Sequence, residues 1–414
     1  MSTAWLLLLA CGSPAPAPSP ARPPTPTSVT PTPTEPPPTT PSSTGATPTT
    51  ATTATTTGTD PCAGGVAALV AGVPYASLQA AFDTSAAEVE VCPGQWTGPW
   101  VVATPVHLVG RAGAASTILV GDGVTRAPVL TVAGGTILEG LTITGGNADY
   151  GGGVQRSSGG DLTVVDCVVT ANSADYGGGI ALRDRPNTLS LIRTAVTANA
   201  ALYDGGGIHA DAMAVVSLDA DTAVSANTAG GRGGGVQGLS LRISGGGLLA
   251  DNTALVGGGL DASFAQVTDL TFRANHATFG GGANLTDSAL VIGATFDANT
   301  ADDGAGVSAV WWSGVYAYDG FLFLDGTWTD NVATTRGGAL SAAAGPLLVI
   351  DGGLLARNQA PMGGGLWLDQ IPLSAQAVDW STGVDDNTPE DVWFRGAAVD
   401  RDGVSDLWCD LDCR

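Results

Sequence analysis

The chain has 414 residues, and 44 % of them are hydrophobic, which is enough to build a substantial core. Lys and Arg together number 15 against 38 Asp and Glu, so the formal net charge is −23, and no residue is lysine. A chain this acidic repels phosphate backbones, so nucleic acid is excluded as a partner, while divalent cations and neutral sugars remain open.

The N-terminus reads as an export signal. Residues Ala4–Ala10 form an apolar run too short to span a bilayer, and it ends at Leu8-Leu9-Ala10-Cys11. This ending resembles the lipobox of bacterial lipoproteins, which implies cleavage of a signal peptide over residues 1–10 and acylation of Cys11. The segment departs from that pattern because no Lys or Arg precedes the apolar run. The resemblance implies an outer-membrane, lipid-anchored protein at the cell surface or on the periplasmic face.

Residues 11–60 are dominated by Pro, Thr, Ser and Ala. Such a segment cannot bury enough apolar surface to offset the entropy lost on ordering, so it predicts a disordered tether.

A repeat built on Asn-x-Ala-x-x-Gly-Gly-Gly begins near residue 147. Between its copies lie short apolar stretches that are typical of strands. Units of about 25 residues with short strands and turns predict an all-β fold, a right-handed parallel β-helix of about 10–12 rungs over residues 61–386. The leading asparagines, spaced 23 to 32 residues apart, are Asn147, Asn172, Asn199, Asn227, Asn252, Asn275, Asn299, Asn331 and Asn358, with a degenerate tenth at Asn387.

Each repeat position has a structural task in such a stack. The asparagines are expected to form a hydrogen-bonded ladder along the axis, as side chains do in stacked sheets. The glycines allow tight turns where a Cβ would collide with the neighbouring rung. The alanine two residues after most asparagines fits a narrow interior corner.

Both ends of the stack need caps, because a β-helix exposes unpaired strand edges there. Helical spacing of Leu78, Ala81 and Phe82 predicts a short helix over the first rung, and residues 387–414 are expected to close the other end. Export permits disulfides, and our preferred pairing among three alternatives joins Cys62 to Cys92 and Cys409 to Cys413. Cys167 is then left over and is expected to be a buried small residue.

The repeats resemble those of polymorphic outer membrane proteins, which carry Phe-x-x-Asn and Gly-Gly-Ala-Ile motifs. Phe272 to Asn275 and Phe296 to Asn299 match the first motif, and SLQAAFDTSAAEVEVCPGQWTGPW is similar to the opening of pectate-lyase-like β-helix proteins. The resemblance covers about residues 75–387 and implies a surface adhesin. The family's C-terminal barrel-length segment has no counterpart after Asn387, so the expected lipid anchor would take over its role.

An acidic column is the main candidate for chemistry. Asp149, Asp175 and Asp204 all precede glycine triplets and lie beside Tyr150, Tyr176 and Tyr203. Aligned carboxylates could act as a catalytic acid and base or bind Ca²⁺; the alternative is that they are solvated turn residues. The histidines at 107, 209 and 276 occur in unrelated contexts and suggest no metal site.

The long interval between Asn299 and Asn331 is rich in aromatic residues. If they are exposed, Trp311, Trp312, Tyr316 and Tyr318 form a patch that could bind a glycan or a protein. The competing interpretation buries Trp311, Val315 or the pair Phe321 and Phe323 inside an extended rung. The sequence does not decide between the two.

Three functional hypotheses follow. The leading one is a non-enzymatic adhesin or a rod that binds surface glycans or host and neighbour-cell proteins, held at the membrane by its lipid anchor and needing no cofactor. The second is a polysaccharide lyase or glycoside hydrolase that uses the acidic column, with Ca²⁺ as its one candidate cofactor. The third is a purely structural surface component. Regular rungs argue against an enzyme, because functional sites tend to interrupt local regularity.

Overall fold

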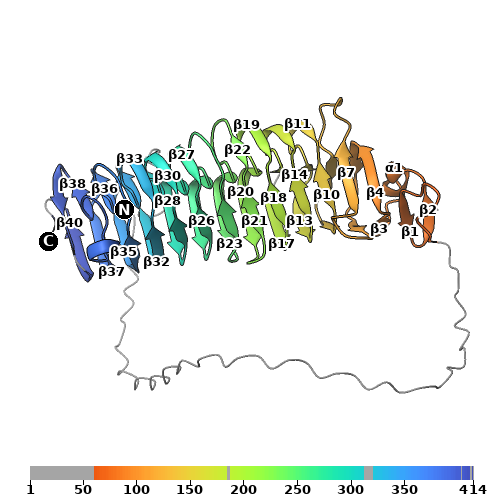
Figure 1. Ribbon diagram of the computed structural model, residues 1–414. Coiled ribbons are helices and arrows are strands. Elements are labelled where there is room, and N and C mark those ends of the chain that lie inside the picture. The colour runs from red at the N-terminus through yellow and green to blue at the C-terminus, as the bar shows by residue number, and fades with distance from the viewer. Residues whose placement is uncertain (1–59, 184–186, 312–319, 402, 411–412, 414) are drawn as a thin grey trace, which may run out of the picture. The chain divides into compact units, whose positions relative to one another are not determined.

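The computed structural model describes residues 60–183, 187–311, 320–401, 403–410 and 413. By its internal contacts the chain divides into residues 1–57 and a unit of residues 58–414. The expected signal peptide, Cys11 and the tether lie outside the described residues. The second unit is a parallel β-solenoid of about 11 turns, with its strands stacked side by side along one axis (Figure 1).

Each turn of the solenoid places strands in three main stacks, and every strand pairs in parallel with its counterpart one turn away. The first stack, which follows the glycine triplets, contains β5 (Trp100–Val102), β8 (Leu130–Val132), β12 (Val154–Arg156), β16 (Ile180–Leu182), the first parts of β20 (Ile208–Leu218), β23 (Val236–Ser244), β25 (Leu260–Thr268) and β28 (Ala283–Ile292), then β31 (Val307–Val310), β34 (Leu340–Ala343), β36 (Leu366–Asp369) and β38 (Val392–Phe394). The second contains β3 (Glu88–Val91), β6 (His107–Gly110), β9 (Thr136–Glu139), β13 (Gly160–Val165), β17 (Asn187–Ile192), the later parts of β20, β23, β25 and β28, then β32 (Phe321–Thr329), β35 (Leu348–Ala356) and β37 (Leu373–Asp379).

The third stack contains β4 (Gly94–Gly98), β7 (Thr117–Gly121), β10 (Thr142–Thr144), β14 (Val168–Thr170), β18 (Ala195–Thr197), β21 (Ala223–Ser225), β24 (Leu248–Ala250), β26 (Thr271–Arg273), β29 (Thr295–Asp297) and the last parts of β32 and β35. Two short sheets precede the glycine triplets, one of β11 (Asn147–Tyr150), β15 (Ser173–Tyr176), β19 (Ala200–Asp204) and β22 (Thr228–Ala229), the other of β27 (His276–Phe279), β30 (Thr300–Asp303) and β33 (Val332–Arg336).

The asparagine ladder is present and runs from Asn172 to Asn387. In each step the backbone nitrogen and Nδ2 of one asparagine donate to Oδ1 of the next, and Nδ2 also donates to a backbone carbonyl. All nine members are buried. Asn147 is not a member: it is exposed and pairs with Ser173, and Gly146 occupies the ladder position and donates to Oδ1 of Asn172. Its assignment to the ladder was therefore wrong.

The remaining repeat positions explain how the chain turns. The residue before each ladder asparagine from Asn172 to Asn358 has a left-handed conformation, as Ala274 does at φ 52°, and so does the first glycine of each triplet, such as Gly280 at φ 66°. A Cβ on Gly281 would lie 2.5 Å from the carbonyl oxygen of Thr300 in the next rung. The alanines after the asparagines form small buried clusters, one of which contains Ala301, Ala333 and Ala360 together with Ala305 from the Gly-Ala-Gly turn.

The two ends of the solenoid are closed by different elements. Helix α1 (Leu78–Phe82) buries Leu78, Ala81 and Phe82, beside the antiparallel pair β1 (Ala68–Val70) and β2 (Val73–Tyr75). Beyond the short helix η1 (Gly383–Asp385), β38 is still parallel to β36, and β39 (Ala397–Val399) and β40 (Val404–Cys409) then pair antiparallel with β38 and β37. The disulfides Cys62–Cys92 and Cys409–Cys413 confirm the expected pairing, and Cys167 is buried and free.

Candidate functional site

Two columns of outward-facing residues flank the glycine triplets. The wall column, just before the triplets, contains Tyr150, Tyr176, Asp204, Arg232, Val256, Phe279, Asp303 and Arg336. The floor column, two residues after the triplets, contains Gln155, Ala181, His209, Gln237, Asp261, Asn284, Ser308, Ser341 and Trp367. Because strand side chains alternate, floor residues point away from the core filled by their neighbours.

The floor column is nevertheless largely shielded from solvent. His209, Asp261, Asn284 and Ser308 are all buried although none of them belongs to the apolar core. The chain bends at the glycine triplet between the two columns, so the floor residues lie at the bottom of a recess. This recess opens into a hollow of about 520 Å³, lined by Arg232, Val256, Ser263, Phe279, Asn284, Thr286, Asp287, Asp303, Ser308, Val310, Arg336 and Ala343.

Asp261 is the most perturbed acid of this region. Its side chain is buried, its Oδ1 accepts a 2.7 Å hydrogen bond from Nδ2 of Asn284, and its Oδ2 lies 3.7 Å from Nη1 of Arg232. Burial raises the pKa of the Asp261 carboxyl to about 6, although Asn284 and Arg232 act in the opposite direction. This group can therefore hold or release a proton near neutral pH.

Arg336 is held in place from two sides. Its Nε and Nη2 lie 2.7 and 2.6 Å from Oδ2 of Asp303, and its guanidinium carbon lies 3.8 Å above the ring of Trp367. The cation–π contact and the charge-assisted hydrogen bonds fix the arginine against the hollow. Oδ1 of the same aspartate, which is buried, has no hydrogen-bond partner within the described part of the chain.

Other polar atoms of the two columns share this property. Among the residues that the structure describes, Nδ1 of His209 and Oε1 of Gln237 are also shielded from solvent without a hydrogen-bond partner. Buried polar atoms are nearly always hydrogen-bonded in proteins, so these exceptions along the two columns need an explanation, and a polar ligand that supplies the missing partners is one.

Tyrosines extend the wall column toward the N-terminal rungs. The rings of Tyr150, Tyr176 and Tyr203 succeed one another at centroid distances of 5.1 and 5.3 Å. His209 lies 5.3 Å from the ring of Tyr176, and its Nε2 is 2.8 Å from Oδ1 of Asp211. The hydrogen bond from His209 is the main cause of the lowered pKa of Asp211.

The acidic column expected from the sequence is only partly assembled. Asp149 and Asp175 occupy equivalent positions in β11 and β15, and Arg126 binds both carboxylates, so one of their two negative charges is compensated. Asp204 is paired with Tyr176 instead, because β19 contains one extra residue, and its Oδ1 accepts a hydrogen bond from the backbone of Arg232. The described residues bring no three His, Cys, Asp or Glu side chains together in a way that could hold a metal ion.

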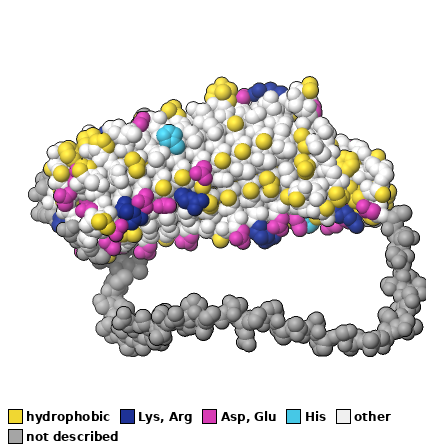
Figure 2. All heavy atoms as spheres, viewed as in Figure 1, with side chains coloured by type: hydrophobic (Ala, Val, Ile, Leu, Met, Phe, Trp, Pro, Cys, Tyr) yellow, Lys and Arg dark blue, Asp and Glu magenta, His cyan; other side chains and the backbone are white. Residues whose placement is uncertain are grey.

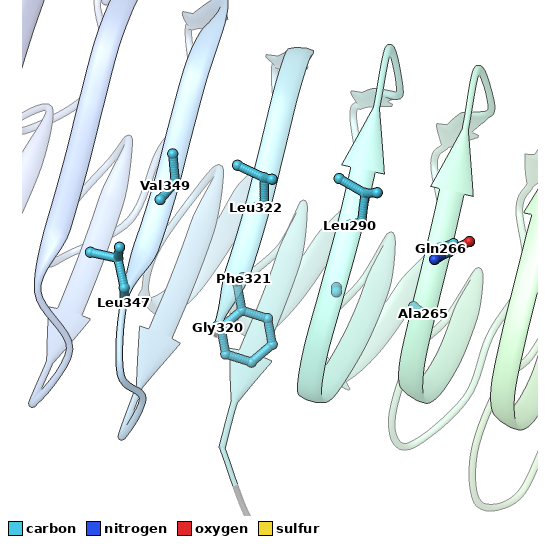
Figure 3. A pocket seen from close by; sticks show the side chains of 9 residues that line it. Ala265, Gln266, Leu290, Gly320, Phe321, Leu322, Leu347 and Val349 are labelled. Atoms are coloured by element: carbon cyan, nitrogen blue, oxygen red, sulfur yellow. The ribbon is translucent and has the colours of Figure 1, made fainter. Parts of the chain in front are cut away.

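Of the aromatic patch, Trp312, Tyr316 and Tyr318 lie outside the described residues, and Trp311 is half-buried. Phe321 and Phe323 are buried, as the extended-rung interpretation expects. An apolar hollow of about 290 Å³, lined in part by Phe321, lies on the outer face of β28, β32 and β35. The side chains of Leu290, Leu322 and Val349 lie next to one another there (Figure 3).

Sequence reasoning missed the residues of the polar hollow, although a signal for them was present. Aligning the repeats on their glycine triplets places Asp261, Asn284, Ser308 and Ser341 at one position, which is polar in successive repeats where its two neighbours are apolar or alanine.

The space-filling view shows acidic and basic side chains next to each other on an otherwise mixed surface (Figure 2).

No protein-family model, curated protein or solved structure matches this chain. Within the described residues, no helix is both long enough and apolar enough to cross a membrane.

Proposed function

We propose that the solenoid is a binding module for a linear glycan, which lies along the axis across the wall and floor columns, in a cell-envelope protein anchored by lipid at Cys11. The observation that carries this proposal is the set of shielded, unpartnered polar atoms of His209, Gln237 and Asp303, which recur along the wall and floor columns. Hydroxyl groups of a sugar supply both donors and acceptors for such atoms.

The shape of the hollow supports an extended ligand. Its lining spans the rungs from Arg232 to Arg336, so equivalent positions recur at intervals of about 4.8 Å along the axis. Phe279 lines it with a side chain that is 43 % exposed, and apolar surface next to polar groups is the composition that ligand sites favour.

A glycan-array screen of the full chain tests the proposal, followed by titration with the best ligand. Phe279→Ala should weaken binding about tenfold, as loss of a central aromatic contact does. Leu255→Ala is the matched control, because Leu255 is a similarly exposed apolar residue in the neighbouring rung that does not line the hollow. Absence of any glycan binding, or equal loss in both variants, would contradict the proposal.

A second candidate function is glycoside hydrolysis. The favouring observation is that Asp261, which contacts Asn284 and Arg232 of the lining, has a pKa of about 6, whereas Asp303 of the lining is paired with Arg336, so the two carboxyls occupy different electrostatic environments. Such a pair can divide the roles of acid and base. Release of new reducing ends from a bound glycan, lost in Asp261→Asn, would favour the enzyme, and binding without turnover would favour the module.

A further inference from the structure

The hollow contains a buried acceptor atom that has no hydrogen-bond donor. Oδ1 of Asp303, which lines the hollow, finds no donor among the described residues, and neither does Oε1 of Gln237, which belongs to the floor column outside this lining. An ionised carboxylate can only accept hydrogen bonds, so a ligand that satisfies Asp303 must present an O–H or an N–H group.

The charges around the hollow favour a cationic donor. Asp261, Asp287 and Asp303 line or underlie it against Arg232 and Arg336, and Asp204 lies one rung beyond Arg232. The ion pair of Arg336 with Asp303 compensates both of these charges, so the surplus of negative charge comes from Asp261, Asp287 and Asp204 against Arg232. The whole chain carries a formal charge of −23, and a field of that sign attracts cations and repels ligand carboxylates.

The neutral part of the lining suits a sugar ring. Ser263, Thr286 and Ser308 offer hydroxyl groups, and Phe279 and Val310 offer apolar surface on either side of the floor. An amine attached to such a ring would bring a charged donor to the carboxylate without losing these contacts.

We infer that the ligand is a linear glycan that carries primary amines, and that an ammonium group of this glycan binds Oδ1 of Asp303. This inference rests on the proposed glycan-binding function and narrows it to one class of ligand. A charge-assisted hydrogen bond to a shielded carboxylate is roughly twice as strong as a neutral one, so the amine should dominate the choice between related glycans.

Three hexasaccharides test the inference in calorimetric titrations of the full chain at mildly acidic pH. They are the β-1,4-linked hexamer of glucosamine, its fully N-acetylated form, and a hexamer of galacturonic acid. We expect the amine form to bind at least tenfold more tightly than the acetylated form, and the uronate to bind most weakly. Raising the salt concentration should weaken the amine form most.

Two variants locate the effect. Asp303→Asn should lower affinity for the amine hexamer about tenfold and affinity for the acetylated hexamer by a clearly smaller factor, because the acetylated hexamer loses only a neutral hydrogen bond. Asp287→Asn removes the other carboxylate of the lining and leaves the ion pair of Asp303 with Arg336 in place, so a selective loss of affinity for the amine hexamer in this variant keeps the test open should Asp303→Asn fold poorly by circular dichroism. Asp251→Asn is the control, because it removes one exposed carboxylate outside the lining of the hollow.

The outcomes separate this inference from the proposed function. Equal affinity for the amine and acetylated hexamers, or tighter binding of the uronate, would overturn the inference and leave glycan binding in place. Equal effects of Asp303→Asn and Asp251→Asn would show that bulk charge acts instead of Asp303, which also overturns it. If none of the three hexamers binds and the glycan array also shows no binding, both the inference and the proposed glycan-binding function are contradicted.

Discussion

Nδ2 of Asn275 lies 3.0 Å from Oδ1 of Asn299, and its second hydrogen is donated to the carbonyl oxygen of Leu249 at 2.9 Å. In turn, Oδ1 of Asn275 accepts from both nitrogens of Asn252. Asn275→Ala would leave these donors and the carbonyl unpaired in a buried turn. We expect the free energy of unfolding to fall by about 3 kcal/mol, since each buried unsatisfied group costs about 1–3 kcal/mol.

Asn147→Ala is the matched control for the ladder. Asn147 is exposed and lies outside the series, so its removal should change the stability by less than about 0.5 kcal/mol. Urea unfolding followed by circular dichroism measures both variants. Similar shifts of the midpoint in the two would contradict the assigned start of the ladder at Asn172.

A pair of glycines tests the close approach of adjacent rungs. A Cβ on Gly281 would lie 2.5 Å from the carbonyl oxygen of Thr300 and 2.6 Å from that of Ala305, and backbone atoms cannot move aside without displacing a rung. We expect Gly281→Ala to lower the melting temperature by several degrees, with a cost of at least about 2 kcal/mol.

Gly238 offers the opposite environment. Its nearest neighbours would be 3.6 Å from an added Cβ, and its φ is not positive. Gly238→Ala should be neutral or stabilise by up to about 1 kcal/mol, because it reduces the entropy of the unfolded chain. A melting temperature that falls equally in both glycine variants would argue against the rung spacing described here.

The fold was predictable because its signal is repeated in every rung. The spacing between each asparagine and its glycine triplet also indicates the two predictions that the structure corrects, the place of Asn147 in the ladder and that of Asp204 in the acidic column. Asn147 precedes its triplet by four residues and Asn172 by five, which shows that Asn147 occupies the position of Ser173. Asn199 precedes its triplet by six residues, and the extra one moves Asp204 out of the column of Asp149 and Asp175.

The polar hollow was harder to predict, for a physical reason. Alternation in β25 identifies Asp261 as outward-facing, and outward residues of a sheet are ordinarily solvated. Its burial results from the bend at the glycine triplet, which brings the wall column beside the floor column. The ion pair of Arg126 with Asp149 and Asp175 likewise joins segments from adjacent turns, and the local sequence of neither segment indicates it.

The two disulfides should contribute unequally to stability. Cys62–Cys92 closes a loop with a sequence separation of 30, whereas Cys409–Cys413 spans only 4. Loop-closure entropy predicts a loss of about 4 kcal/mol for Cys62→Ser with Cys92→Ser and about 2 kcal/mol for Cys409→Ser with Cys413→Ser. Thermal unfolding of the two double variants checks this order, and a larger loss at the C-terminal pair would contradict it.

The stability of the solenoid should fall as the pH rises toward 8. Asp391 is 1 % exposed, and burial raises its pKa to about 7 even though Asn387 and the backbone of Arg401 donate hydrogen bonds to it. A carboxyl whose folded pKa exceeds its ordinary value contributes stability that is fully present below that ordinary value, near 4. This contribution is lost as the pH rises through about 7. Asp261, with a pKa of about 6, acts in the same direction.

Repulsion among the many carboxylates of this acidic chain also grows with pH and also lowers stability. Variants distinguish this general effect from the effect of the buried carboxyls. In Asp391→Asn the decline of the unfolding midpoint between pH 5 and pH 8 should be visibly shallower, by on the order of a few kcal/mol in free energy. Asp251→Asn also removes one negative charge, but from an exposed turn, so it should leave the slope as in the wild type. If both variants flatten the profile equally, net charge governs the pH dependence. If only Asp391→Asn flattens it, the buried carboxyl governs it, because Asp391 loses its hydration on folding and Asp251 does not.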